Sequence, residues 1–338
     1  MINRSKGCFV ILFLMFLLSC GGKAAVVSRM LLGTVVTITI SDKNDNSVEL
    51  FNLAFNEIEK IQRDFSLYSN DSEISMINRK AYPGPLKVSN ELFFLIKSSL
   101  DVSEKTGGAF DITWASSGKL WDFSVEGFTP PDDSKIKSIL PLISYKNIRI
   151  DESSNSIRFL KKDTKIGLGA VAKGYAVKKA VSALRSRGVK GAIVACAGDI
   201  QVIGDYNGRS WKAGIRDPRG NSVIATFLMD DGEAVSTSGD YERFRIVNGR
   251  RYHHIIDPST GYPADSGLIS VTVFSHDPVV SDAYSTAFFV SGIDRTKRVL
   301  LTMSDISAVL VDNNMNVYVS SNIKGKLQFR ENLNVIYF

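Results

Sequence analysis

The stretch GLGAVAKGYAVKKAV, residues 167–181, joins a turn of small residues directly to an amphipathic helix. Glycines before a helix leave backbone N–H groups accessible at the positive end of the helix dipole, an arrangement that favours a bound phosphate. The stretch has neither the Lys-Ser/Thr ending of a P-loop nor the third glycine of a dinucleotide-binding fingerprint. On these residues alone two interpretations stay open: a phosphate site, or a strand-to-helix turn whose glycines serve packing.

Strand-like and helix-like segments surround this stretch. Apolar or β-branched alternation predicts strands at residues 35–40, 192–196, 199–204, 211–215, 223–229 and 268–274, with hairpins over 147–160 and about Asn248-Gly249. Apolar residues at helical spacing predict helices over 48–65, 91–105, 134–140 and 171–187, a short helix capped near Asp71, a helix that Ser281 caps and that ends near Gly292, and a further helix near 296–302. Antiparallel strands are expected from there to Phe338.

The balance of these segments predicts the fold class. Strands outnumber helices and mostly connect through short turns, which favours an α+β fold with a large, mostly antiparallel sheet and flanking helices. No repeat or long linker divides residues 29–338. We interpret them as a single domain, with two lobes as an alternative.

The first residues indicate export. Arg4 and Lys6 precede an apolar run, 9–18, that is too short to span a bilayer, and the run ends in a Leu-Leu-Ser-Cys-Gly box that resembles a bacterial lipoprotein cleavage site. We predict a signal peptide over 1–19, an acylated Cys20, and a lipid-anchored tether over 20–28, which places the protein on the periplasmic face of the inner membrane. An ordinary signal peptide or an uncleaved anchor is the alternative.

Composition indicates a globular protein, with 44% hydrophobic and 22% charged residues. The formal net charge of +6 is spread without a run of five basic residues, which argues against nucleic acid as a partner and is compatible with an anionic small molecule. Cys8 and Cys20 fall in the signal peptide and the anchor, so no internal disulfide is expected. Cys196 lies in an apolar strand and is expected to be inert.

Asp282 and Thr286 are candidate metal ligands. They lie four residues apart, so on a helix their oxygens face the same side. Carboxylate and hydroxyl oxygens suit Mg²⁺, which completes its octahedron with water and substrate phosphates. The alternative is a helix cap, with Thr286 on an inward face.

Three other kinds of side chain could take part in chemistry. His253 and His254 would point to opposite faces of a strand, so one is expected to face solvent and the other to point inward. An inward histidine near a phosphate could be a general base, with a structural histidine as the alternative. Lys173 could contact a phosphate or cover its helix flank, and Tyr68 could stack on a planar ring or be an ordinary loop residue.

Several motifs in this order resemble the ApbE-type FAD:protein FMN transferases. They are Met30…Gly33-Thr34, SLYSNDSEISMIN (66–78), GGAFDIT (107–113), GLGAVAKGYAVKKA (167–180), AGDI (197–200), STSGDYERF (236–244), HHIIDPSTGYP (253–263) and SDAYSTA (281–287). The resemblance covers nearly all of the predicted mature chain. It implies an α+β fold related to the T-fold and Mg²⁺-dependent transfer of FMN from FAD to a Thr or Ser of an exported acceptor protein, with release of AMP.

The resemblance also implies individual roles. It assigns the metal to the backbone carbonyl of Ala170, to Asp282 and to Thr286, with Ser285 close, and it makes His254 the candidate base. The FAD contacts that it implies are Met30, Tyr68, Ala109, Phe110, Asp111, Gly167, Lys173 and Ile256.

Three positions bear on which reaction occurs. The family usually has Asp where this chain has Gly167, and commonly an acidic residue where Lys178 stands. The first departure removes a side-chain contact to FAD. Some spirochaete relatives with another residue in place of Tyr68 look more like FAD hydrolases, so Tyr68 favours transfer. The alternatives are an FAD pyrophosphatase that gives FMN and AMP, and a lipid-anchored protein that binds FAD without chemistry.

Overall fold

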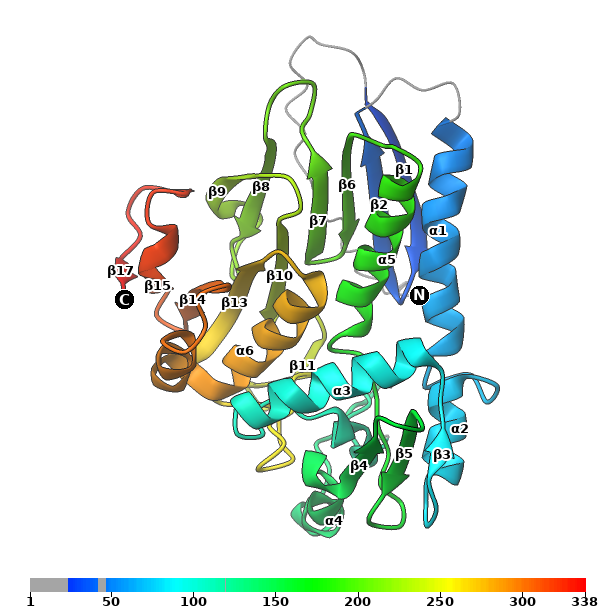
Figure 1. The fold of residues 1–338 in the computed structure, drawn as a ribbon. Helices are drawn as coiled ribbons and strands as arrows, with labels where there is room; N and C mark the ends of the chain where they lie inside the picture. The colour runs from blue at the N-terminus through cyan, green and yellow to red at the C-terminus, as the bar shows by residue number, and fades with distance from the viewer. Residues whose placement is uncertain (1–23, 42–46, 119) are drawn as a thin grey trace, which may run out of the picture.

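The computed structural model describes residues 24–41, 47–118 and 120–338. Its main sheet contains nine strands, which lie side by side in this order: β1 (Ala25–Leu31), β2 (Thr34–Ile40), β6 (Gly191–Cys196), β7 (Asp199–Gly204), β10 (Ala234–Gly239), β13 (Leu268–Ser275), β14 (Ser307–Asp312), β15 (Val317–Val319) and β17 (Val335–Tyr337). All neighbours are antiparallel except β15 and β17. The predicted α+β fold with a large, mostly antiparallel sheet is confirmed (Figure 1).

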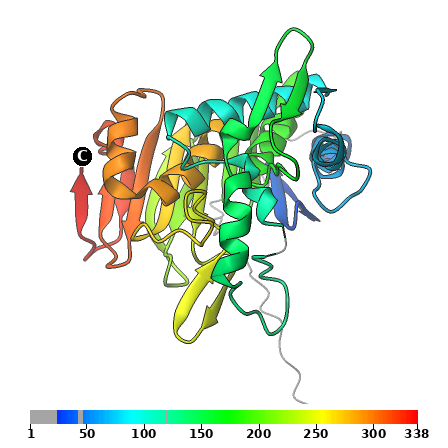
Figure 2. The ribbon, with the colours of Figure 1, turned by 90° about the horizontal axis from the view of Figure 1, so that it is seen from below.

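Three smaller sheets accompany the main one. They are β3 (Leu86–Lys87) with β5 (Ser156–Phe159) and β4 (Ile148–Asp151), β16 (Leu327–Phe329) with β9 (Val223–Met229) and β8 (Trp211–Arg216), and the hairpin of β11 (Phe244–Val247) and β12 (Arg250–His253). The β16-β9-β8 sheet packs on one face of the main sheet, where Trp211, Phe227 and Val309 share an apolar core. The β11–β12 hairpin, yellow in Figure 2, turns at Asn248-Gly249 as predicted.

The helices α1 (Ser47–Asp64), α5 (Ala172–Ser186) and α6 (Pro278–Leu300) cover the opposite face of the main sheet (Figure 1). The other helices are α2 (Glu73–Lys80), α3 (Asn90–Lys105) and α4 (Asp133–Ile139), with the short 3₁₀ helices η1 (Ile112–Ser117), η2 (Leu140–Leu142), η3 (Tyr145–Asn147) and η4 (Ser321–Ile323). Phe55 of α1, Val177 of α5 and Phe288 of α6 lie in one apolar core with strand residues such as Val194. None of the helices in the described part of the chain is long and apolar enough to cross a bilayer.

The prediction of a tether over residues 20–28 is wrong for its last four residues. Residues 25–28 belong to β1, which pairs with β2 along its whole length about the Leu32-Gly33 turn. The segment Ala-Val-Val-Ser-Arg-Met-Leu is rich in residues that suit a half-buried strand, and this propensity decides its structure. The predicted signal peptide, Cys8 and Cys20 lie outside the described residues.

Two predictions near the C-terminus are also wrong. Asp277, not Ser281, caps α6, because its side chain accepts the N–H of Val279 and Pro278 occupies the first turn. The break at Gly292 is confirmed, since φ is 73° there and the predicted second helix continues beyond it as the end of α6. β17 runs parallel to β15 because the intervening chain first adds β16 to the small sheet and then returns.

Candidate functional site

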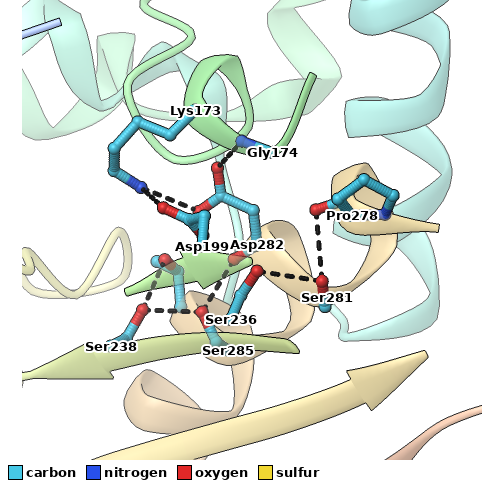
Figure 3. A network of polar contacts seen from close by, with 10 residues as sticks. Lys173, Gly174, Asp199, Ser236, Ser238, Pro278, Ser281, Asp282 and Ser285 are labelled. Carbon is cyan, nitrogen blue, oxygen red and sulfur yellow. Dashed lines mark hydrogen bonds and ion pairs between the residues drawn. The ribbon is translucent and has the colours of Figure 1, made fainter. Parts of the chain in front are cut away.

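Two buried carboxylates share one lysine where the start of α5 meets α6 and β7 (Figure 3). Nζ of Lys173 lies 2.6 Å from Oδ2 of Asp199 and 3.2 Å from Oδ1 of Asp282. Only 3% of each carboxylate side chain is exposed, against 30% of the lysine side chain. When all three groups are ionised, two negative charges face one positive charge, and one negative charge is left uncompensated.

Asp282 also caps α5 from the neighbouring helix. Its Oδ2 accepts the N–H of Gly174 at 2.9 Å. This N–H belongs to the first helical turn, whose donors lack partners within the helix, and Val171 at the N-cap position supplies no side-chain bond. The N-terminus that the sequence suggested as a phosphate cradle therefore binds a carboxylate of the same chain, whose charge also suits the helix dipole.

The closeness of the two helices requires glycine at position 174. A Cβ there would lie 2.1 Å from the carbonyl oxygen of Pro278 and 2.9 Å from Cβ of Asp282. Without a side chain, α6 can approach until its carboxylate reaches the backbone of α5. Glycine in the AKGYAV motif thus positions the acidic pair.

Burial and charge shift the protonation of this centre. Burial and the charge of Asp199 raise the pKa of Asp282 to about 7, against the opposing effects of Lys173 and the Gly174 N–H. Burial lowers the pKa of Lys173, but the charges of Asp199 and Asp282 outweigh it, so that this pKa lies above its ordinary value. The lysine stays protonated, and when both carboxylates are ionised it balances only one of their two negative charges.

A row of hydroxyl groups continues from the acidic pair between β10 and α6 (Figure 3). Oγ of Ser238 lies 2.7 Å from Oγ of Ser285 and 3.2 Å from Oγ1 of Thr286. Oγ of Ser236 lies 2.9 Å from Oγ of Ser281. Alternate residues of a strand face the same side, which explains why positions 236 and 238 both meet the helix.

Three of the predicted metal ligands lie together on α6, and the fourth lies in the turn before α5. Asp282, Ser285 and Thr286 lie within two turns of α6, and Ala170 is half-buried in the turn two residues before α5 begins. Within the described chain, no three His, Cys, Asp or Glu side chains form a metal-binding cluster. A cation here would combine Asp282 with hydroxyl and carbonyl oxygens, which are donors that suit a hard ion.

His254 is the outward histidine of the pair, and His253 is the inward one, as expected of neighbours at a strand end. Nδ1 of His254 lies 3.3 Å from the carbonyl oxygen of Arg243. A carbonyl only accepts, so Nδ1 carries the proton and Nε2 keeps its lone pair. Desolvation and, next, the positive charge of Arg243 lower the pKa of His254, with a smaller contribution from Lys173. The ring is therefore neutral near pH 7, and its exposed surface leaves it accessible to a substrate.

His253 organises the segment that carries its neighbour. Its Nε2 donates to the carbonyl oxygen of Ala264 at 3.0 Å, and its Nδ1 accepts the N–H of Ile255 at 3.3 Å. The ring also packs edge-on against Phe289 of α6. Burial lowers the pKa of His253, which keeps it neutral in this arrangement.

Two of the predicted FAD contacts are exposed apolar side chains. Met30 is 71% exposed and Tyr68 is 96% exposed. The N–H of Leu32 donates to the side chain of Gln62 at 2.6 Å, which ties the β1–β2 turn to the last turn of α1. Met30 and Tyr68 each lie within a few residues of this junction. A large exposed apolar side chain at either position is suited to contact a ligand.

The remaining predicted contacts are internal. A Cβ on Gly167 would lie 2.8 Å from Cδ1 of Leu67 and 3.1 Å from Cβ of Ala115, so neighbouring side chains fill the space that the family's Asp would need. Asp111 accepts bonds from the N–H and hydroxyl of Thr113 and from the N–H of Tyr145. Burial raises the pKa of Asp111, and these bonds oppose the shift. The other three contacts, Ala109, Phe110 and Ile256, are buried.

Sequence reasoning missed Asp199 as a site residue. It belongs to the AGDI motif, and the signal that could have identified it is a carboxylate at the turn between two strand-like segments, where it is the first residue of β7. Lys178, the other departure from the family pattern, pairs with Asp277 at 2.7 Å. Cys196 is buried, and burial followed by the charge of Asp199 raises its pKa to about 12, as expected of an unreactive thiol.

These features define an α+β enzyme in which an anionic, oxygen-rich centre accompanies a neutral histidine. The chain belongs to the ApbE family, whose sequence model matches residues 32–310. A FAD:protein FMN transferase of Klebsiella pneumoniae (strain 342) is 29% identical over 295 residues, which are 87% of this chain and 91% of the relative. Another, from Treponema pallidum (strain Nichols), is 28% identical over 335 residues, 92% of this chain and 91% of the relative.

Solved structures show the same similarity. The ApbE protein of Thermotoga maritima superposes with a TM-score of 0.83 at 34% identity, covering 91% of this chain and 100% of its own. The flavin transferase ApbE from Vibrio cholerae gives a TM-score of 0.81 at 26% identity, covering 89% of this chain and 99% of its own.

Proposed function

We propose that this protein transfers FMN from FAD to a Thr or Ser hydroxyl of an exported acceptor protein and releases AMP. The observation that carries the proposal is the exposed His254, whose Nδ1 lies 3.3 Å from the carbonyl oxygen of Arg243 and whose Nε2 is therefore the proton acceptor. The transferases that resemble this chain along most of its length support the same reaction.

In the proposed reaction, the acceptor hydroxyl attacks the FMN-side phosphorus of the pyrophosphate in line with the departing AMP. A bond forms between the acceptor oxygen and phosphorus, and the bond from phosphorus to the AMP phosphate oxygen breaks with its electron pair leaving on AMP. Nε2 of His254 takes the hydroxyl proton. Lys173 offers a fixed positive charge to the pyrophosphate. Met30 and Tyr68 offer exposed apolar surface to the flavin.

We further propose Mg²⁺ as the cofactor, held by Asp282, Thr286 and the carbonyl of Ala170, with Ser285 beside them. The uncompensated charge of the acidic pair and the hydroxyl oxygens on α6 fit a hard divalent cation. When bound, Mg²⁺ would neutralise negative charge on the pyrophosphate.

We also propose that the mature protein is anchored by acylated Cys20 at the periplasmic face of the bacterial inner membrane. The support is the charged, apolar and Leu-Leu-Ser-Cys-Gly sequence of residues 4–21. An exported enzyme at this surface would meet acceptor proteins that are themselves exported.

The test is an incubation of the purified protein with FAD, Mg²⁺ and an exported acceptor that carries a threonine in the context Asp-Gly-x-x-Ser/Thr-Gly-Ala-Thr. Covalent flavin on that threonine, with one AMP released per flavin, is the expected result. FMN and AMP without labelled acceptor would make the protein an FAD pyrophosphatase. Intact FAD would contradict both enzymes and leave a flavin-binding protein.

A further inference from the structure

We propose that Asp199 is a positioning residue, which holds Lys173 away from Asp282 and thereby sets the affinity of this centre for a divalent cation. The proposal concerns the metal site of the proposed function and rests on it. Asp199 forms an ion pair with Lys173, and it acts on the metal site through this lysine.

One carboxylate oxygen of Asp282 is available both to Lys173 and to a metal ion, while the other is already hydrogen-bonded. Oδ2 is committed to the N–H of Gly174 at 2.9 Å. Oδ1, the oxygen left for a cation, is the atom that Nζ of Lys173 reaches at 3.2 Å. A cation at Asp282 must therefore compete with the ammonium group of the chain's own lysine.

Asp199 offers that ammonium group a second and closer partner. Its Oδ2 lies 2.6 Å from Nζ of Lys173, against 3.2 Å for Asp282. Asp199 begins β7 and pairs in register with Cys196 of β6, so its backbone is fixed in the middle of the main sheet. The lysine side chain is long, flexible and partly exposed, so it can shift wholly onto Asp199 when another cation takes Oδ1.

Counting charges predicts opposite effects on cation affinity when Asp199 or Lys173 is replaced. Asp199→Asn removes a nearby negative charge and frees Lys173 to pair with Asp282 alone, and both effects disfavour a bound cation. Lys173→Met removes the competing positive charge and favours it. The double variant leaves Asp282 with no competitor and restores the original net charge of the trio, which is one negative charge in each case.

Mg²⁺ binding measured by titration calorimetry tests this on the full-length protein in detergent and without FAD. We expect Asp199→Asn to weaken Mg²⁺ binding about tenfold or more, Lys173→Met to tighten it by a similar factor, and the double variant to return within about threefold of wild type. Asp199→Glu keeps a carboxylate and should rescue most of the loss. If Lys173→Met fails to fold, Lys173→Gln carries the same prediction.

Two controls separate the possible failures. Lys178→Gln removes a lysine–aspartate pair between the same two helices, outside the trio, and should leave the affinity unchanged. Asp282→Ala should abolish binding. A double variant as weak as Asp199→Asn would make Asp199 a direct ligand and overturn the positioning role, as would weaker binding by Lys173→Met. If wild type itself binds no Mg²⁺, or Asp282→Ala binds it equally well, the metal site of the proposed function is wrong and the inference falls with it.

Discussion

At the scale of single residues, the reactive atom of His254 is fixed by a backbone carbonyl. The Arg243 carbonyl accepts a hydrogen bond from the protonated Nδ1, which leaves Nε2 as the proton acceptor. His254→Asn removes this base, and we expect transfer to fall by about 10²-fold to 10⁴-fold, the usual contribution of general base catalysis. FAD affinity should stay within about threefold of wild type, because the proton is taken only during reaction. Single-turnover transfer and FAD titration measure the two quantities.

His276 supplies the matched control for this change. It is an exposed histidine at the start of the loop before α6, away from the segment that carries His254. His276→Asn should leave transfer unchanged. Loss of FAD binding in His254→Asn, with transfer per bound FAD unchanged, would make His254 a binding residue instead of a base.

Gly167 departs from the family pattern for a steric reason. Leu67 and Ala115 occupy the space beside it. Gly167→Asp should lower the free energy of unfolding by about 1–3 kcal/mol through overpacking. Adding Leu67→Ala should recover at least about 0.5 kcal/mol of that loss relative to Leu67→Ala alone, since the two positions touch. Urea unfolding of wild type, the two single variants and the double variant completes the double-mutant cycle. Strictly additive changes in the free energy of unfolding would contradict the steric explanation.

The sequence predicted which side chains of α6 lie on the same side of the helix, but not their contacts with other elements. Asp282 and Thr286 were singled out because a spacing of four on one helix is local information. In the structure, Asp282 accepts the N–H of Gly174 and Thr286 lies beside the hydroxyl of Ser238. Asp199 was missed because its meaning depends on Lys173, which lies on a helix that only the folded sheet brings near. Contacts across elements are set by packing, which no local pattern encodes.

At the scale of elements, the crossing of α5 and α6 should be the most sensitive point of the site. Gly174→Ala would push a methyl group against the Pro278 carbonyl, and we expect the free energy of unfolding to fall by about 3 kcal/mol or more, at the upper end of overpacking effects. In Gly169→Ala, on the same glycine-rich turn, the new methyl group would meet only Trp114 at an ordinary 3.8 Å. Equal stabilities of these two variants would show that the helices are not in close contact.

The segment between β12 and Ala264 should lose stability in acid through His253. The pKa of His253 is lower in the folded protein than in the unfolded chain. Below about pH 6.5 the unfolded chain therefore binds a proton at this residue more readily than the folded protein does. The free energy of unfolding decreases as the pH falls through this range. Relative to His253→Gln, wild type should lose up to about 1.4 kcal/mol more per pH unit below that value. Urea unfolding at several pH values measures the difference, and parallel profiles would exclude a buried neutral His253.

The sequence predicted the bounds of helices and strands correctly where only one residue could mark the boundary. The helix predicted over 91–105 is Asn90–Lys105, and the hairpin about Asn248-Gly249 formed as predicted. The start of α6 was missed because Ser281 and Asp277 can both cap a helix, and the choice depends on Pro278 and on the packing of that turn. β1 was missed because its pattern is half exposed and resembles a tether until β2 pairs with it.

At the scale of the whole molecule, the start of β1 and the proposed base lie at opposite ends of this strand. Four residues separate Cys20 from Ala25, so an acyl chain on Cys20 would hold Ala25 within roughly 17 Å of the membrane surface. The seven residues of β1 then lead away over about 23 Å to the Leu32-Gly33 turn. Gly33 lies against the side chain of Arg243, whose carbonyl binds His254. A lipid anchor on Cys20, as proposed, would therefore leave the site at the end of β1 that is farther from the membrane attachment.

This arrangement predicts that anchoring and transfer are separable. Replacing residues 1–20 by an ordinary cleavable signal peptide should remove the acyl group, move the protein from the membrane to the soluble fraction, and leave transfer to a soluble acceptor within about twofold of wild type. Transfer to a membrane-anchored acceptor should fall, because the two proteins no longer share one surface and lose their high effective concentration. Mass spectrometry of the N-terminal peptide, fractionation and paired transfer assays measure these effects. Membrane retention without Cys20 would exclude lipid anchoring, and an equal loss with both acceptors would show that the N-terminal segment contributes to the site itself.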